Sequence, residues 1–170
     1  MAQSYDTIFR GGIVVNQDGQ GARDLGISHG RIAAIGDLSK ASAGSVVDCA
    51  GLHILPGVID TQVHFREPGA THKEDLESGS RSAVMGGVTA VFEMPNTDPL
   101  TITPEALADK VKRGYHRMHC DFAFFIGGTH DNFRELPEWE RLPGCAGVKV
   151  FMGSSTGSLL VGDEAGLRNI

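Results

Sequence analysis

The sequence predicts an α/β fold that consists of the first half of a closed (β/α)8 barrel, preceded by a small N-terminal β-sandwich. Residues 1–56 contain short β-branched runs bounded by glycine, which indicate strands joined by tight turns. Residues 57–170 alternate apolar strands with amphipathic helices, which is typical of a parallel sheet covered by helices. A closed barrel needs about 250 residues, so residues 57–170 suffice for about four of its β/α units. An open doubly wound sheet would show the same alternation.

The N-terminal unit is expected to hold about five strands. Turn residues such as Gly11-Gly12, His29-Gly30 and Gly36-Asp37 separate its apolar runs. These runs are Ile8, Ile13-Val14-Val15, Leu25-Gly26-Ile27, Ile32-Ala33-Ala34-Ile35 and Val46-Val47.

The second unit begins with a predicted strand from Gly57 to Phe65. Thr71-His72-Lys73-Glu74 then matches a capping box, in which the threonine caps a helix and the glutamate three residues later bonds back to it. A second strand is predicted from Val88 to Phe92, since this run is apolar and β-branched.

Another helix is predicted after Thr103-Pro104-Glu105, because a cap residue, a proline and an acidic residue follow one another there. Its apolar face is expected to include Leu107, Val111, Tyr115 and Met118.

The rest of the chain repeats the pattern. It predicts a strand over 122–126, a short amphipathic helix over 132–141, a strand over 146–152 and the first turns of a helix over 163–170. Since the barrel would then be half built, we expect the natural chain to continue past Ile170.

Composition and charge argue against nucleic acid or an anionic membrane surface as the main partner. The chain of 170 residues carries 15 Lys+Arg and 21 Asp+Glu, a formal net charge of -6. Nucleic acid or an anionic membrane surface would favour a basic patch instead. No run approaches the ~20 apolar residues of a membrane-spanning helix, and no secretory signal precedes the strands. The cysteines are widely spaced, as is usual for reduced thiols. We therefore expect a cytoplasmic protein that engages neither nucleic acid nor a membrane.

The densest polar cluster lies at the end of the first predicted barrel strand. Because a strand alternates its faces, Asp60, Gln62, His64 and Arg66 are expected to share one side. Ligands bind at the carboxyl ends of strands in α/β sheets and barrels. A lone histidine is often a hydrogen-bonded core residue, but Arg66 two residues later favours a binding site here.

Two further candidates follow other predicted strands. Asn96 comes directly after the second strand, where it is either a turn former or a substrate contact at the same edge as Arg66. Lys149 lies in the fourth strand among apolar neighbours, where desolvation of an ammonium costs several kcal/mol. It either reaches solvent at the sheet edge or is a neutral amine able to add carbon dioxide. The resulting carbamate would be a two-oxygen anion able to bridge two cations.

These clusters, in this order, resemble the dihydroorotases of the amidohydrolase superfamily. The resemblance rests on HFREPG at residues 64–69, MPNT at 94–97 and Gly147-Val148-Lys149, and it extends over essentially the whole chain. Residues 1–56 resemble the family's urease-like composite β-sandwich domain, and residues 57–170 resemble the first four β/α units of its barrel. Related hydantoinases and allantoinases usually lack the arginine, so Arg66 favours dihydroorotase among them.

The resemblance implies a metal-dependent hydrolase that interconverts dihydroorotate and N-carbamoyl-L-aspartate in pyrimidine biosynthesis. Two zinc ions would polarise the ring amide carbonyl and supply a bridging hydroxide, and one zinc ion is the alternative because of Gln62. By position, His64 matches a metal ligand, Lys149 matches the bridging carbamate, and Arg66 and Asn96 match residues that hold the substrate carboxylate. The family's general-base aspartate and later histidine ligands would lie beyond Ile170, so this chain alone is expected to be inactive.

Gln62 departs from the family pattern, because it stands where the first histidine of a His-x-His pair is usual. An amide oxygen is a weaker zinc ligand than an imidazole nitrogen. A single-metal enzyme, a different metal and a relative without activity are therefore alternatives. Two other readings are a hydantoinase or dihydropyrimidinase relative, and a non-catalytic dihydroorotase-like partner of aspartate transcarbamoylase. A homo-oligomer is also expected.

Overall fold

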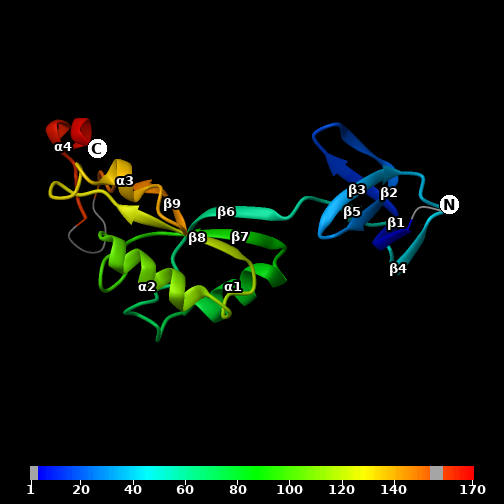
Figure 1. Cartoon of the computed structure of the whole chain (residues 1–170), viewed down its shortest axis with the longest axis horizontal. Coiled ribbons are helices and arrows are strands. Elements are labelled where there is room, and N and C mark those ends of the chain that lie inside the picture. Colours follow the sequence, from blue (N-terminus) through cyan, green and yellow to red (C-terminus); the bar gives the residue numbers. More distant parts are fainter. Residues whose placement is uncertain (1–3, 154–158) are drawn as a thin grey trace. The chain divides into compact units, whose positions relative to one another are not determined.

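The computed structural model describes residues 4–153 and 159–170 (Figure 1). The chain divides into two compact units, Met1–Pro56 and Gly57–Ile170. Among the described residues, the first unit holds strands and the second alternates strands with helices. No described helix is long and apolar enough to cross a membrane.

The first unit is built around one long strand, β1 (Ser4–Asn16). It pairs antiparallel with β2 (Gly19–Ser28), which in turn pairs antiparallel with β3 (Arg31–Gly36). On its other side β1 pairs in parallel with β4 (Ser42–Asp48) and β5 (His53–Ile54). The buried side chains Tyr5, Ile8, Val14 and Leu25 come from β1 and β2.

The turn predicted at Gly11-Gly12 is wrong, because both glycines lie inside β1. The pairing of β1 with β2 shifts register between Phe9 and Gly12, which marks a bulge rather than a chain reversal. A Cβ on Gly12 would come within 2.7 Å of Ile54 Cδ1 and 2.9 Å of Cys49 Cβ. The second glycine therefore permits close packing within the sheet, and two predicted strands become one.

The second unit contains a parallel sheet in the order β6 (Val58–Val63), β7 (Val88–Glu93), β8 (Asp121–Gly127) and β9 (Cys145–Lys149). Its longer helices are α1 (Leu76–Met85) and α2 (Pro104–Gly114), and both lie on the same side of the sheet (Figure 1). The hydrophobic core of this unit consists of Phe65, Leu76, Val91, Leu107 and Phe124, which come from both the sheet side and the two helices. The predicted alternation of strands and helices is confirmed.

The two long helices differ in how well their starts could be predicted. For α2 the prediction is confirmed, since the Thr103 side chain accepts a hydrogen bond from the Ala106 N–H at 3.3 Å. For α1 the predicted capping box at Thr71 is wrong. The helix begins after Asp75, whose Oδ1 accepts from the Ser78 N–H at 2.7 Å. Glu67 Oε2 accepts from the Leu76 N–H at 3.0 Å, so a second carboxylate also fixes the helix start at this position.

Other elements are shorter than predicted. The helix expected over 132–141 is reduced to α3 (Leu136–Trp139), and the final helix is α4 (Glu164–Asn169). Tyr115 is not part of an apolar helix face: α2 ends at Gly114, and Tyr115 is its C-cap with 66% of its surface exposed.

Candidate active site

The candidate site begins where β6 ends. The strand stops at Val63, so His64, Phe65 and Arg66 already belong to the loop. Arg66 has a φ of 64°, a left-handed conformation that is uncommon for a residue with a side chain. The predicted alternation that would place Arg66 on one strand face with Asp60 and Gln62 is therefore wrong at Arg66. A residue held in such a conformation is typical of functional loops.

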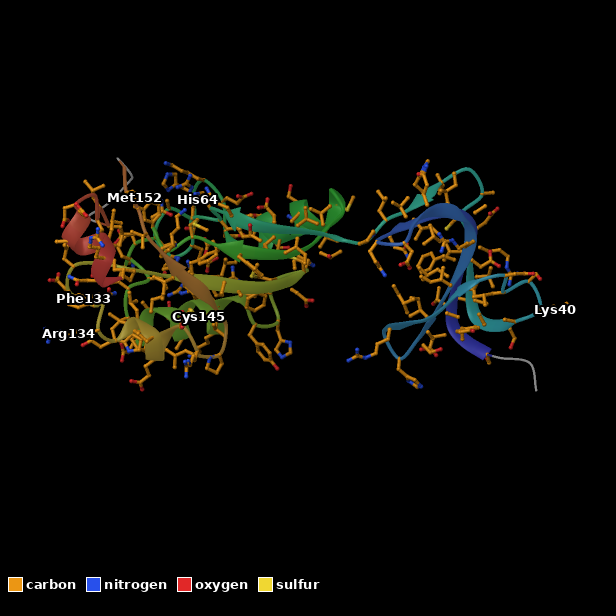
Figure 2. All side chains as sticks on the ribbon, turned by 90° about the horizontal axis from the view of Figure 1, so that it is seen from above. Lys40, His64, Phe133, Arg134, Cys145 and Met152 are labelled. Atoms are coloured by element: carbon orange, nitrogen blue, oxygen red, sulfur yellow. The ribbon has the colours of Figure 1, made fainter. Side chains whose placement is uncertain are left out.

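His64 and Asn96 are brought into contact, although 32 positions separate them in the sequence. The His64 Nδ1 and the Asn96 Oδ1 lie 2.9 Å apart, at the carboxyl ends of the neighbouring strands β6 and β7 (Figure 2 labels His64). An amide oxygen only accepts, so the Nδ1 carries the proton in this arrangement. The Nε2 then has a free lone pair, which is the form of imidazole that binds a cation.

Three cationic side chains act on the His64 ring. Partial burial lowers the pKa of His64, the hydrogen bond with Asn96 opposes this, and the charges of Arg66, Lys149 and Lys110 lower the pKa further. The neutral ring is thereby favoured. The neutral ring keeps its Nε2 lone pair, and the nearby Arg66 offers a positive charge to an anionic group of a ligand.

The other two predicted site residues lie on strands. Gln62 is exposed on β6, and its backbone N–H donates to the Asp60 side chain at 3.0 Å. Lys149 is the last residue of β9; it is half-buried, and its Nζ lies 5.3 Å from the centre of the Phe151 ring. Among the described residues of this unit, the fully buried lysine is Lys110 instead, with 1% of its surface exposed.

Lys110 of α2 forms a buried ion pair with Glu93, the last residue of β7. The Lys110 Nζ lies 2.5 Å from Glu93 Oε2, and each side chain is 1% exposed. The Nζ also donates to the Met94 carbonyl at 3.1 Å and lies 4.9 Å from the centre of the Phe124 ring. Burial lowers the pKa of Lys110 and raises that of Glu93, because each counter-charge offsets only part of the desolvation.

A second buried carboxylate, Glu67, lies in the loop that carries His64. It accepts hydrogen bonds from both terminal nitrogens of Arg117, at 2.7 and 3.2 Å. It also accepts from the Leu76 N–H, as described above for the start of α1. Glu67 therefore ties the loop after β6 to α1 and to the segment that follows α2.

The sequence pattern predicts no role for either Glu67 or Glu93. Lys110 follows Leu107 by three positions and so falls within the apolar stripe of the predicted helix, which is a signal of an internal partner. The sequence does not show which residues pair, because Glu93 is 17 positions away from Lys110 and Glu67 is 50 positions away from Arg117.

The described residues fit part of a zinc site and not a whole one. They contain no group of three or more His, Cys, Asp or Glu side chains placed to hold a metal ion. His64 offers one imidazole, while zinc sites in proteins use three or four ligands. Among the described residues, the remaining candidate ligands are Lys149, if it forms a carbamate, and the amide oxygen of Gln62.

Comparison with known proteins agrees with this architecture. Residues 53–155 match the model of the Amidohydrolase family. The chain belongs to the amidohydrolase family. The L-hydantoinase (dihydropyrimidinase) from Arthrobacter aurescens has a TM-score of 0.89 and 31% identity, covering 97% of this chain and 37% of that chain. The predicted fold class, part of a (β/α)8 barrel with a sheet of N-terminal strands, is thereby confirmed.

Curated relatives of this amidohydrolase carry more than one name. An allantoinase from Deinococcus radiodurans is 37% identical over 153 residues, which is 89% of this chain and 34% of that protein. A dihydroorotase from Methanosarcina mazei is 39% identical over 139 residues, which is 81% of this chain and 30% of that protein. The chain thus spans about a third of the length of the relatives it matches.

Members of this superfamily typically depend on metal ions. An N-acyl-D-glutamate deacylase from Bordetella bronchiseptica, solved with zinc and a phosphonate inhibitor, shares the fold at a TM-score of 0.56 and 22% identity, covering 78% of this chain and 31% of that chain.

Proposed function

We propose that this amidohydrolase acts on a cyclic amide that carries a carboxylate, in the manner of a dihydroorotase. The reaction is the reversible addition of water across a ring C–N bond of dihydroorotate, which gives N-carbamoyl-L-aspartate. The observation that supports it is the His64–Asn96 contact of 2.9 Å at the carboxyl ends of β6 and β7, with His64 in the same loop as Arg66.

The chemistry of Arg66 favours this substrate within the class. A guanidinium presents parallel N–H donors that match the two oxygens of a carboxylate. Dihydroorotate carries such a carboxylate, whereas allantoin and unsubstituted hydantoin do not. In this proposal Arg66 and Asn96 bind the carboxylate at the carboxyl ends of β6 and β7, next to the His64 ring.

A metal ion is part of the proposal, with zinc as the first candidate. His64 would bind it through Nε2, and Lys149 would bind it as a carbamate after adding carbon dioxide and releasing a proton. Gln62 is a weaker candidate because it lies exposed on β6 and offers only an amide oxygen. A bound zinc would supply Lewis-acid polarisation of the ring carbonyl.

Allantoin hydrolysis is the second candidate. It is supported by the allantoinase from Deinococcus radiodurans, which is nearly as similar as the dihydroorotase from Methanosarcina mazei (37% against 39% identity) and aligns over more of this chain.

The test is a comparison of initial rates on dihydroorotate, allantoin and hydantoin, with the protein expressed from its natural reading frame and supplied with zinc. We expect dihydroorotate to give the highest kcat/KM. In Arg66→Gln we expect kcat/KM for dihydroorotate to fall by about 100-fold, since a charged hydrogen-bonded contact is worth up to about 3 kcal/mol.

Allantoin serves as the matched control in the same variant. Faster turnover of allantoin than of dihydroorotate, with little effect of Arg66→Gln, would support the second candidate instead. No turnover of any of the three compounds would support the non-catalytic alternative.

A further inference from the structure

The Glu93–Lys110 ion pair contacts the backbone on both sides of the His64–Asn96 contact. Glu93 Oε1 accepts from the N–H of Phe65, the residue after His64, at 3.1 Å. Lys110 Nζ donates to the carbonyl of Met94, two residues before Asn96, at 3.1 Å. One buried pair is therefore bonded to both segments that meet at the candidate site.

These bonds replace sheet pairing that ends at this point. The last backbone bond between the two strand ends runs from the Met94 N–H to the Val63 carbonyl at 3.0 Å. Beyond Val63 the chain leaves the strand, so the buried N–H of Phe65 has no ladder partner. The Glu93 side chain supplies the acceptor that the sheet does not, and an unpaired buried N–H would be costly.

The stability of the core does not require an ion pair at Glu93 and Lys110. Burial of two charges carries a desolvation penalty that apolar side chains of similar volume avoid. Phe124, whose ring centre lies 4.9 Å from the Lys110 Nζ, belongs with Leu107 to an apolar core that forms without the pair. Unlike an apolar pair, the ion pair forms directional hydrogen bonds with the Phe65 N–H and the Met94 carbonyl.

We propose that Glu93 and Lys110 are positioning residues for His64, which hold the Phe65 and Met94 backbones so that the His64 Nδ1 donates to Asn96 and the Nε2 faces the ligand. They do not touch the substrate in this scheme. The catalytic consequence rests on the proposed function, whereas the effect on the His64 ring does not.

The test compares two double variants of the protein expressed from its natural reading frame. Glu93→Met with Lys110→Met removes both charges and both backbone bonds. Glu93→Gln with Lys110→Met removes the same charges but keeps an amide oxygen for the Phe65 N–H. The two variants therefore differ by one hydrogen bond and not by charge.

The first readout is the tautomer of His64, measured before zinc is added by long-range 1H–15N NMR on protein with 15N-labelled histidine at about pH 8, where imidazole is neutral. His64→Gln assigns the signal by deleting it. We expect the Nδ1–H form in the wild type, a mixture of both tautomers in Glu93→Met/Lys110→Met, and a smaller shift in Glu93→Gln/Lys110→Met.

The second readout is the split between kcat and KM. We expect kcat to fall about tenfold in Glu93→Met/Lys110→Met, the lower end of the range for groups that orient a ligand histidine, with KM within about twofold. Val111→Ala, which thins the same core without touching either bond, is the control and should leave the tautomer and kcat unchanged.

A folded Glu93→Met/Lys110→Met with the wild-type tautomer would overturn the proposal. If that variant does not fold, the His64 spectrum of Glu93→Gln/Lys110→Met is compared with that of the Val111→Ala control. Equal spectra in these two variants would overturn the proposal. A tautomer that shifts in a protein without turnover on any cyclic amide supports the positioning role and contradicts only the proposed reaction.

Discussion

The loop after β6 and the end of β7 each hold a buried glutamate, and the two are stabilised in different ways. Glu67 is 4% exposed and Glu93 is 1% exposed. Glu67 accepts from the Arg117 guanidinium and from a helix N–H, and the guanidinium itself reaches solvent with 40% of its side chain exposed. Glu93 has one cation, and that cation is as deeply buried as Glu93 itself.

The two carboxyls consequently shift in opposite directions. Burial would raise the pKa of Glu67, but the hydrogen bonds from Arg117 and Leu76 hold it below its ordinary value. Burial raises the pKa of Glu93, and Lys110 with the Phe65 N–H compensates only in part. The comparison shows that the direction of each shift is a balance between burial, which is deeper at Glu93, and the hydrogen bonds and charges that favour the carboxylate.

The largest expected effect comes from removing the buried cation alone. Lys110→Met leaves Glu93 buried without a counter-charge, which costs about 3–5 kcal/mol of unfolding free energy. Urea denaturation followed by the fluorescence of Trp139 in α3 reports on this unit. Glu93→Gln/Lys110→Met is the control and should recover most of the loss. A single variant as stable as the double variant would contradict the account of the pair.

Glu67→Gln should be less damaging, and its effect should depend on pH. A carboxyl whose pKa is lowered by folding adds stability above its unfolded pKa of about 4.3, and this contribution is lost as the pH falls through the lowered folded value. We expect a loss of about 1–2 kcal/mol near pH 7, since the arginine is partly exposed. Denaturation of both proteins between about pH 7 and pH 3 should show the difference vanishing at the acidic end. A constant difference would show that the charge of Glu67 is not what stabilises the loop.

The smallest effect distinguishes the two arginines near Glu67. Arg117 uses both terminal nitrogens on the carboxylate, whereas Arg113 approaches it only to 3.7 Å and bonds Asp109 instead. Arg117→Lys keeps the charge but loses the paired geometry, so we expect about 1 kcal/mol of destabilisation. The matched variant Arg113→Lys should change stability by less than about 0.5 kcal/mol. Equal effects of the two would mean that charge alone matters at this loop.

Much of the fold could be predicted because its signals are local. The Thr103-Pro104 start of α2 was readable because a cap and a proline act on the helix next to them. Asp75 was missed because Thr71 presents an equally good capping pattern, and the choice between them depends on Glu67 bonding to Leu76. Gly11-Gly12 was misread because a bulge and a turn have the same composition, and the packing of Ile54 decides between them.

The site was predictable to the extent that topology determines it. Parallel neighbouring strands bring their carboxyl ends together, which is why His64 and Asn96 could be expected at one edge and are found in contact. The left-handed Arg66 and the Glu93–Lys110 pair depend on tertiary packing, for which a single sequence carries no pairing information. Roles for Gln62 and Lys149 as metal ligands remain predictions.

The backbone of Arg66 places stability and recognition in opposition at one position. A left-handed conformation costs a residue with a side chain about 1–2 kcal/mol, and glycine adopts it freely. A screen for heat resistance alone would thus favour Arg66→Gly, raising the melting temperature while removing the guanidinium proposed to hold the substrate. Engineering this amidohydrolase for stability should therefore begin elsewhere in the chain, and a gain in Tm at residue 66 should be judged against the KM for the carboxylate-bearing ring.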